Sequence, residues 1–413
     1  MKISHIILKD PEDVRKNLLP LTYTRPIAEI TLGILSIREK WLRRLPEATY
    51  CWITADYLSE KFPSTPISPA PADKYAPLQP EGATLAVNGN IVPSDTIIAE
   101  IMAAAERSEG KNLELKAPGG KSIGTLSMPG AQPDAECAQY TLSCPVVTIE
   151  WVYDIFLKNF DAIADDYALI TKGRKSAPLD PSCCLIGDPS QLFIEEGASV
   201  TGAIINVTGG PVYIASAATV MEGVCMRGPI AMCEHSQANM GTKIYGGTTL
   251  GIYCKVGGEL NNVVMLGYSN KAHDGFLGNA VIGQWCNLGA GCVASNLKND
   301  YTEIKLWNYP AHRFLRTGLQ FCGLIMGDHS KAGINAMFNT ASVIGVGVNI
   351  HGAGFPRNFV ASFQEGSAAG FTDVPMAKFI DTARRMMARR SVELTDADIR
   401  MFDAIRHIAD DYK

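Results

Sequence analysis

The chain has 413 residues, 46% of them hydrophobic and 19% charged, with a formal net charge of -5 at pH 7. This length exceeds what one hydrophobic core usually organises, and the composition is that of a folded globular protein, so we expect at least two folding units and exclude extended disorder. The chain lacks the basic excess that binding to nucleic acid requires, and no run reaches the roughly 18 apolar residues of a membrane span. We therefore expect a cytoplasmic protein with neither nucleic acid nor membrane as a partner.

The first part of the chain alternates apolar strands with helical stretches, which is typical of a parallel α/β layer. The expected strands cover residues 3–8, 49–54 and 84–87. Apolar residues at helical spacing predict an amphipathic helix over residues 27–42.

Cap and turn signals predict the other elements of this half. Ser94 or Asp95 can cap a helix that runs to about Ala105, and Gly119-Gly120 fits the turn of a hairpin within residues 111–128. A longer helix from about Trp151 closes an α/β domain of residues 1–170. Residues 171–181 are expected to form a linker.

Beyond the linker, apolar residues recur every six positions, without interruption, at Ile214, Val220, Met226, Met232, Ala238, Ile244, Leu250 and Val256. A period of six belongs neither to a helix nor to an ordinary strand. It fits a solenoid with a triangular coil, in which each side places one aliphatic side chain inside. The sequence therefore predicts a left-handed parallel β-helix of hexapeptide repeats over residues 182–372.

The repeat breaks at residues 267–278 and resumes at Ile282, Leu288 and Ala294, so we expect a loop to leave the coil at the break. Glycine-rich hexads continue over residues 325–352. Thr395 with Asp398 predicts the capped start of a last helix in a helical tail of residues 373–413.

The broken segment concentrates polar groups where the repeat calls for aliphatic ones. Acyl transfer to an amine needs a base that takes the proton as the nitrogen attacks the thioester, and His273 is the histidine of this segment. Asn287 and Asn296 can supply amide dipoles that hold a substrate or stabilise an oxyanion. The structural alternatives are a loop histidine bonded to the backbone and asparagines bonded along solenoid turns.

From about residue 184 to 360 the chain resembles the acetyltransferase half of the bifunctional N-acetylglucosamine-1-phosphate uridylyltransferase and glucosamine-1-phosphate acetyltransferase family. The whole chain is similar to the Bacteroidetes variant of that family, through Leu-Pro-Leu-Thr-Tyr-Thr-Arg-Pro from Leu19 and Gly-Tyr-Ser-Asn-Lys from Gly267. Segments that line the family's acetyl-transfer site correspond to Arg227-Gly-Pro, Ser269-Asn-Lys-Ala-His, Asn287-Leu-Gly-Ala-Gly and Ser295-Asn-Leu-Lys.

This resemblance implies an acetyl-coenzyme A-dependent transferase that acts on an amino-sugar phosphate as a homotrimer. The implied catalytic residues are His273, as the base, with Asn287 and Asn296. The implied substrate ligands are Arg227, Lys271 and Lys305.

The phosphates of coenzyme A are expected to meet Lys331 and Arg357. An exposed solubilising role is the alternative for both. Two departures from the family bear on the identity of the sugar, because a lysine pair is replaced by Asn261-Asn262 and a tyrosine by Phe276.

For the amino-terminal half, an α/β domain of the nucleotidyltransferase type, the resemblance implies nucleotidyl transfer from UTP to a sugar-1-phosphate. The family's glycine-rich phosphate loop has no counterpart before Gly33, and the nearest segment offers Thr22, Thr24 and Arg25 as donors to phosphate. Asn90 replaces the carboxylate that holds Mg²⁺ and is a weaker ligand for that ion. Asp56 is an alternative carboxylate.

These features predict a bifunctional enzyme that makes UDP-N-acetylglucosamine from acetyl-coenzyme A, a glucosamine-1-phosphate-like sugar phosphate and UTP. One alternative is an acetyltransferase, or a protein that binds a sugar nucleotide, with a degenerate, inactive nucleotidyltransferase domain. Another is the same chemistry on a different amino sugar or nucleotide-linked sugar. A zinc carbonic anhydrase shares the coil, but its paired histidine ligands four residues apart are missing from the sequence.

Overall fold

The structure, a computed structural model, describes residues 2–68, 82–130 and 137–413 and divides the chain into two units. The first unit comprises Met1–Lys16, Arg25–Ile30 and Leu35–Glu150. The second comprises Asn17–Thr24, Thr31–Ile34 and Trp151–Lys413.

A six-stranded sheet organises the first unit. Its strands, in spatial order, are β4 (Thr49–Ile53), β1 (Ile3–Lys9), β5 (Ala83–Asn88), β8 (Ser122–Ser127), β7 (Leu113–Lys116) and β9 (Ala138–Thr141). β1 runs parallel to both β4 and β5, which confirms the three expected strands and their parallel arrangement. β7 and β8 pair antiparallel and confirm the expected hairpin, and β6 (Ile91–Val92) pairs with β10 (Val147–Thr148).

Helix α3 (Asp95–Arg107) confirms the helix expected after Ser94. The Ser94 hydroxyl accepts a hydrogen bond from the Ile97 N–H (3.2 Å), which satisfies one of the donors left free at a helix start. A shorter helix, α1 (Glu12–Asn17), follows β1.

The expectation of a single helix over residues 27–42 is wrong for its first half. That half holds a 3-10 turn (Ile27–Glu29) and the short strands β2 (Thr31–Leu32) and β3 (Leu35–Ser36). Gly33 adopts φ +83°, a left-handed conformation that interrupts a helix. Helix α2 (Ile37–Arg44) begins only after Ser36, where Ser36 and Glu39 form a reciprocal capping box.

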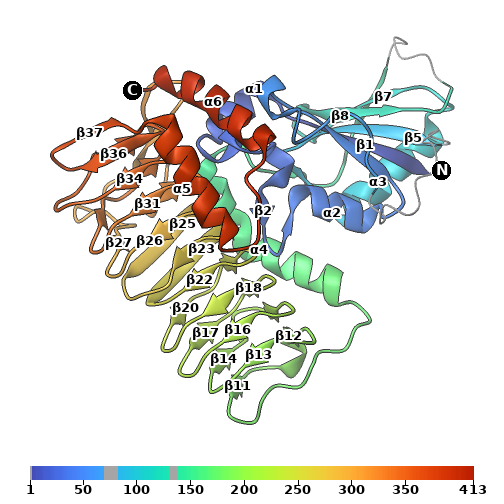
Figure 1. Cartoon of the computed structure of the whole chain (residues 1–413). Helices are drawn as coiled ribbons and strands as arrows, with labels where there is room; N and C mark the ends of the chain where they lie inside the picture. Colours follow the sequence, from blue (N-terminus) through green and yellow to red (C-terminus); the bar gives the residue numbers. More distant parts are fainter. Residues whose placement is uncertain (1, 69–81, 131–136) are drawn as a thin grey trace. The chain divides into compact units, whose positions relative to one another are not determined.

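The second unit is a coil of parallel strands (Figure 1). From β11 to β20, each strand pairs in parallel with the strand three further along the chain, so the coil has three faces. The first face contains β11 (Cys184–Ile186), β14 (Ile204–Asn206), β17 (Cys225–Arg227) and β20 (Lys243–Ile244). The second contains β12 (Leu192–Ile194), β15 (Val212–Ile214), β18 (Ile230–Met232), β21 (Thr248–Leu250), β30 (Ile325–Met326), β33 (Val343–Ile344) and β35 (Phe359–Val360).

The third face of the coil carries much of the candidate site. Its strands are β13 (Ser199–Val200), β16 (Thr219–Val220), β19 (Gln237–Ala238), β22 (Lys255–Val256), β24 (Asn270–Lys271), β26 (Asn287–Leu288), β31 (Lys331–Ala332), β34 (Asn349–Ile350) and β36 (Gln364–Ser367). The long strands β23 (Glu259–Gly267) and β25 (Phe276–Gln284) run through the first and second faces. β27 (Val293–Ala294) pairs with β32 (Met337–Phe338).

The core of the coil consists of the hexad residues that the sequence places inside. All of those from Ile214 to Val256 belong to one buried hydrophobic cluster. Ile214, Met232 and Leu250 stack on successive turns of the second face, and Val220, Ala238 and Val256 do so on the third. The expected parallel coil with one inward side chain per side is therefore confirmed.

The expectation that a loop leaves the coil at residues 267–278 is wrong. β24 lies within this segment and β25 begins in it, and they pair with β22 and β23 of the preceding turn. The hexad spacing is lost because β23 and β25 each pass from the first face to the second without a separate turn. Each strand bends at a single left-handed residue, Asn262 (φ +56°) in β23 and Asn279 (φ +45°) in β25. Asparagine tolerates this left-handed conformation better than most residues, and the coil continues with shorter sides.

The segment that does leave the coil lies between β27 and β30. It contains an antiparallel hairpin of β28 (Lys305–Asn308) and β29 (Arg313–Arg316).

Three helices accompany the coil. α4 (Val152–Thr171), the helix expected from about Trp151, packs on strands β21, β23 and β25, where Asn159 Nδ2 donates to the Gly247 carbonyl (2.8 Å). At the far end, β37 (Gly370–Asp373) pairs antiparallel with β36 and is followed by α5 (Met376–Ala388) and α6 (Asp396–Asp410). The capping box of Thr395 and Asp398 starts α6 as expected. Among the described residues, no helix combines the length and apolar character needed to cross a bilayer.

Candidate functional site

His273 lies in the turn between β24 and β25, with its side chain exposed. The turn is fixed by its backbone, because the Gly291 N–H donates to the Asp274 carbonyl (3.0 Å) and Gly275 adopts a left-handed conformation (φ +125°). The imidazole is therefore presented to solvent by a defined backbone.

Lys271 occupies an inward position on the third face, in the column that contains Val256 and Leu288. The residue is 1% exposed, and its ammonium donates to the carbonyl oxygens of Gly257 (3.2 Å) and His273. Burial lowers the pKa of Lys271. The side chain thus ties the His273 turn to the preceding coil, and its expected contact with substrate stays a prediction.

The two predicted asparagines lie in different places. Asn287 is exposed on the third face, where its Oδ1 accepts from Asn270 Nδ2 (3.4 Å) on the neighbouring strand. Asn296 lies beyond β27 and donates to Asn279 Oδ1 (2.8 Å). Both contacts join successive turns of the coil, as in the structural alternative for these residues.

Arg227 is exposed at the end of β17 on the first face. Its neighbour Met226 pairs with Ile244, Ile244 pairs with Leu260, and Leu260 pairs with Leu277. β17 therefore lies three strands away from β25, the strand that follows His273. Three strand spacings amount to about 14 Å, so one chain does not bring Arg227 and His273 into contact.

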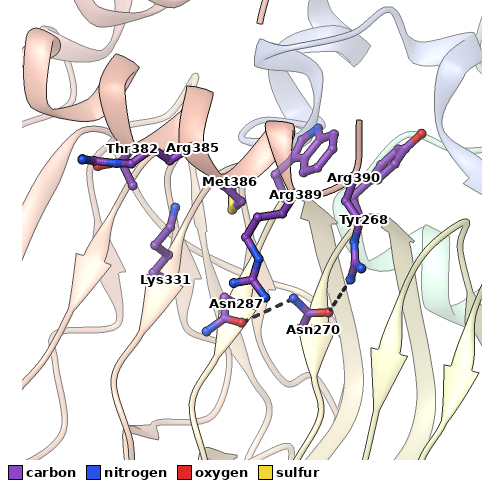
Figure 2. A pocket seen from close by; sticks show the side chains of 10 residues that line it. Tyr268, Asn270, Asn287, Lys331, Thr382, Arg385, Met386, Arg389 and Arg390 are labelled. Carbon is purple, nitrogen blue, oxygen red and sulfur yellow. Dashed lines mark hydrogen bonds between the residues drawn. The ribbon is translucent and has the colours of Figure 1, made fainter. Parts of the chain in front are cut away.

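A cavity of ≈ 340 Å³ lies between the third face and α5 (Figure 2). The coil contributes Tyr268, Asn270, Trp285, Asn287 and Lys331, and the tail contributes Thr382, Arg385, Met386, Arg389 and Arg390. Figure 2 shows Arg389 extending from the end of α5 toward Asn287, and Arg390 reaching Asn270, whose Oδ1 accepts from its guanidinium (3.5 Å). Two residues predicted from the sequence, Asn287 and Lys331, therefore meet in one cavity.

Positive charge dominates this cavity. None of the described residues that line it is acidic, and Arg385 has a carboxylate partner, Asp381, on its own helix (2.8 Å). Burial lowers the pKa of Lys331, whose Nζ donates to the His329 carbonyl (3.0 Å). The pKa of nearby Lys255 is also lowered, by burial and then by the charges of Arg390 and Arg389. The cavity is suited to an anion with more than one charge.

Aromatic rings form one wall. They belong to a column at one corner of the coil, in which each residue has a left-handed backbone and stacks on the next: His235, Tyr253, Tyr268, Trp285 and His329. Tyr268 and Trp285 are 4.1 Å apart between ring centroids, and the Arg390 guanidinium lies 5.9 Å from the Tyr253 centroid. This wall offers aromatic surface on which a planar group of a ligand in the cavity can pack.

Lys305 and Arg357 lie elsewhere, in an open groove of ≈ 820 Å³ beside the β28–β29 hairpin. The groove shares no lining residue with the first cavity. The structure therefore brings these two predicted residues together and separates both from Lys331.

In the first unit, polar residues meet at the carboxyl ends of the parallel strands β4, β1 and β5, the edge where α/β sheets bind ligands. Asp10 follows β1, and its carboxylate accepts from the Thr54 hydroxyl (2.6 Å) and the Ile27 N–H (3.0 Å). Burial raises the pKa of Asp10 to about 6. Asp56, the carboxylate considered from the sequence, is exposed after β4.

Asn90, two residues after β5, is 2% exposed, and its Oδ1 has no hydrogen-bond partner within the described chain. Arg25 is buried in the same unit.

Thr22 and Thr24 are also buried but belong to the second unit, where the Thr24 hydroxyl donates to Asp328 Oδ2 (2.8 Å). Their role as phosphate donors stays a prediction.

Two groups of functional residues were not predicted from the sequence. Asp10 was signalled only by its position directly after the first strand. The arginines of α5 are visible as Arg384-Arg385 and Arg389-Arg390, but the sequence does not show which face of the coil they meet.

A family model described as sugar nucleotidyl transferase matches residues 6–175, and this match supports a transferase. Among solved structures, the UDP-N-acetylglucosamine acyltransferase of Francisella novicida is 13% identical over 57% of this chain and 76% of its own, with a TM-score of 0.27. AntD, an N-acyltransferase from Bacillus cereus in complex with dTDP and 3-hydroxybutyryl-CoA, is 11% identical over 50% of this chain and 91% of its own, with a TM-score of 0.21. At TM-scores this low the likenesses support no conclusion about activity. Comparison with curated proteins gives no match.

Proposed function

We propose that the second unit transfers an acetyl group from acetyl-coenzyme A to the amino group of a glucosamine-1-phosphate-like sugar phosphate. The cavity between the third face and α5 carries this proposal. Its arginines and Lys331 suit the phosphates of coenzyme A, and Tyr268 and Trp285 offer aromatic surface to the adenine. β24, which brings Asn270 to the cavity, runs directly into the turn that presents His273.

In the proposed step, neutral His273 accepts a proton as the sugar nitrogen attacks the thioester carbonyl carbon. The new C–N bond forms, the C–S bond breaks, and the thiolate leaves as coenzyme A after taking up a proton. Asn287 is the proposed amide donor to the oxygen that becomes negative in the intermediate. Lys271 holds the turn through the His273 carbonyl.

Release of free thiol from acetyl-coenzyme A tests this proposal, with glucosamine-1-phosphate and glucosamine-6-phosphate as separate acceptors and the acetylated sugar identified by mass spectrometry. We expect thiol release that depends on an amino-sugar phosphate. Binding of acetyl-coenzyme A without transfer to either acceptor would instead support the alternative of a binding protein.

We propose nucleotidyl transfer from UTP to a sugar-1-phosphate as the activity of the first unit. The family match over residues 6–175 and the polar edge of the parallel strands favour it. Arg25 is the proposed donor to phosphate. Asp10 and Asn90 offer the oxygen ligands that Mg²⁺ prefers, and an ion held there would offset the charge of the triphosphate.

Formation of pyrophosphate from UTP and N-acetylglucosamine-1-phosphate tests the second activity. We expect UDP-N-acetylglucosamine as the product and weaker UTP binding after Arg25→Ala. Absence of both UTP and UDP-sugar binding by calorimetry would leave acetyl transfer as the activity of the chain.

We also propose a homotrimer, the assembly implied by the resemblance. Light scattering should give about three times the chain mass of 44.5 kDa. A mass near 44.5 kDa at micromolar concentration would refute the trimer.

A further inference from the structure

The groove beside the β28–β29 hairpin has the character of a second ligand site. Its volume of ≈ 820 Å³ is within the range of small-molecule sites. The hairpin supplies Lys305, Trp307 and Phe314, and the segment that leads into β35 supplies Arg357, Asn358 and Phe359. Lys298, Tyr412 and Lys413 complete the lining.

Aromatic rings make up the apolar part of this groove. Trp307 stacks on Phe359 with ring centroids 4.2 Å apart, and Phe314 meets Trp307 edge to face at 5.4 Å. Phe314 is nevertheless 40% exposed. These packed rings fix Phe314 and Trp307 in place and leave aromatic surface open to a ligand.

Cations surround the rings. The lining contains Lys298, Lys305, Arg357 and Lys413 but no Asp or Glu among the described residues. Lys413 is ion-paired with Asp373 and Asp410, and the charge of Lys298 interacts with the carboxylates of Asp300 and Glu303. Arg357 donates to Gln364 Oε1 (2.5 Å), a neutral acceptor that orients the guanidinium. Lys305 is exposed on β28.

We propose that this groove binds the nucleoside-phosphate part of a ligand, with the base against Phe314 and Trp307 and the phosphates at Lys305 and Arg357. A planar base matches the aromatic surface, and a phosphate matches the cations of Lys305 and Arg357. Neither a simple sugar nor an apolar chain would use both features. The chemistry is shared by two sources, a uridine nucleotide and the adenosine phosphate end of coenzyme A.

This site goes beyond the proposed function, because the described residues that line it all belong to the second unit and differ from those of the cavity under α5. The groove and the α5 cavity each contain one tryptophan, Trp307 and Trp285. Ligand binding at the two sites can therefore be observed separately in one protein.

The experiment is ¹⁹F NMR of the full chain labelled with 5-fluorotryptophan, which gives one signal for each of its five tryptophans. Trp307→Phe and Trp285→Phe identify the two reporter signals. UDP, coenzyme A and inorganic phosphate are added in separate titrations. Lys305→Gln and Phe314→Ala are the test variants, and Arg313→Gln is the matched control because it removes a charge from an exposed residue of the same hairpin.

We expect the Trp307 signal to shift and saturate with UDP or coenzyme A at concentrations below those needed for phosphate. Lys305→Gln should raise the half-saturating concentration about tenfold, as loss of a charged hydrogen bond does, and Arg313→Gln should change it less than about twofold. Whichever of UDP and coenzyme A binds more tightly identifies the source. No shift of Trp307 with either nucleotide, or equal potency of phosphate, would overturn the proposal. Coenzyme A that shifts only Trp285, together with UDP that does not shift Trp307, would do the same while leaving the proposed function intact.

Discussion

Lys271 and Gly257 are joined inside the coil, where the lysine ammonium donates to the glycine carbonyl oxygen at 3.2 Å. Neighbouring turns of the same column hold Val256 and Leu288, so a charged group occupies an aliphatic position. Because the same ammonium also donates to the His273 carbonyl, this buried cation links the core of the coil to the turn of the proposed base.

The buried lysine predicts a pH dependence of stability. Because the folded pKa of Lys271 is lowered, raising the pH discharges the folded lysine while the unfolded one is still charged. Wild type should therefore gain unfolding free energy relative to Lys271→Met as the pH rises toward 10.5. Urea unfolding followed by circular dichroism measures the difference, with exposed Lys243→Met as the control. A difference that does not vary with pH would contradict the prediction.

His273→Ala should lower acetyl-transfer turnover by about a hundredfold to ten-thousandfold, the usual contribution of a general base. Affinity for acetyl-coenzyme A and the unfolding midpoint should stay nearly unchanged because the side chain is exposed. Steady-state kinetics measure turnover and affinity, and His407→Ala, an exposed histidine on α6, is the control. Full turnover in His273→Ala would place the base elsewhere.

Arg389→Gln and Arg390→Gln should each weaken acetyl-coenzyme A binding about tenfold, because each removes a charged donor from the cavity under α5. Their effect should shrink as salt is added, since these arginines act partly through their charge. Calorimetry at low and high ionic strength measures this. Arg384→Gln removes an equal charge from an exposed position of α5 that does not line the cavity. An equal loss of affinity in Arg384→Gln would argue for a general charge effect.

The buried carboxyl group of Asp10 predicts the opposite pH dependence of stability in the first unit. Its pKa is raised by burial from 3.8 to about 6, so the folded state holds the proton more tightly than the unfolded chain. Stability relative to Asp10→Asn should be greatest below about pH 4 and fall by about 3 kcal/mol as the pH rises through 6. Thermal unfolding of both proteins from pH 4 to pH 7.5 measures this loss. Parallel curves would show that Asp10 ionises normally.

The coil could be predicted from the sequence because each inward residue repeats at a fixed spacing. The inward positions from Ile214 to Val256 were predicted from that spacing alone. The rule failed at Asn262 and Asn279, where left-handed residues bend a continuous strand and shorten the repeat. An irregular stretch of sequence then resembles a departing loop, although its strands remain paired.

The candidate site could be predicted only in part. Asn287 and Lys331 were found and share a cavity, but Arg389 and Arg390 complete it from more than fifty residues away in the sequence. An amphipathic helix does not specify which surface it will cover, because that depends on tertiary packing. Lys305 and Arg357 were expected to bind different ligands and instead line one groove.

The ending of the coil determines how these molecules can meet. A parallel solenoid has open strand edges that invite another copy to add on and extend it into a fibre. Here β37 turns back against β36, and Phe379 and Phe402 of the tail pack edge to face on His329, the last ring of the aromatic column. At this end the third face therefore closes with an antiparallel strand, and a second copy cannot add a parallel strand in register to that face.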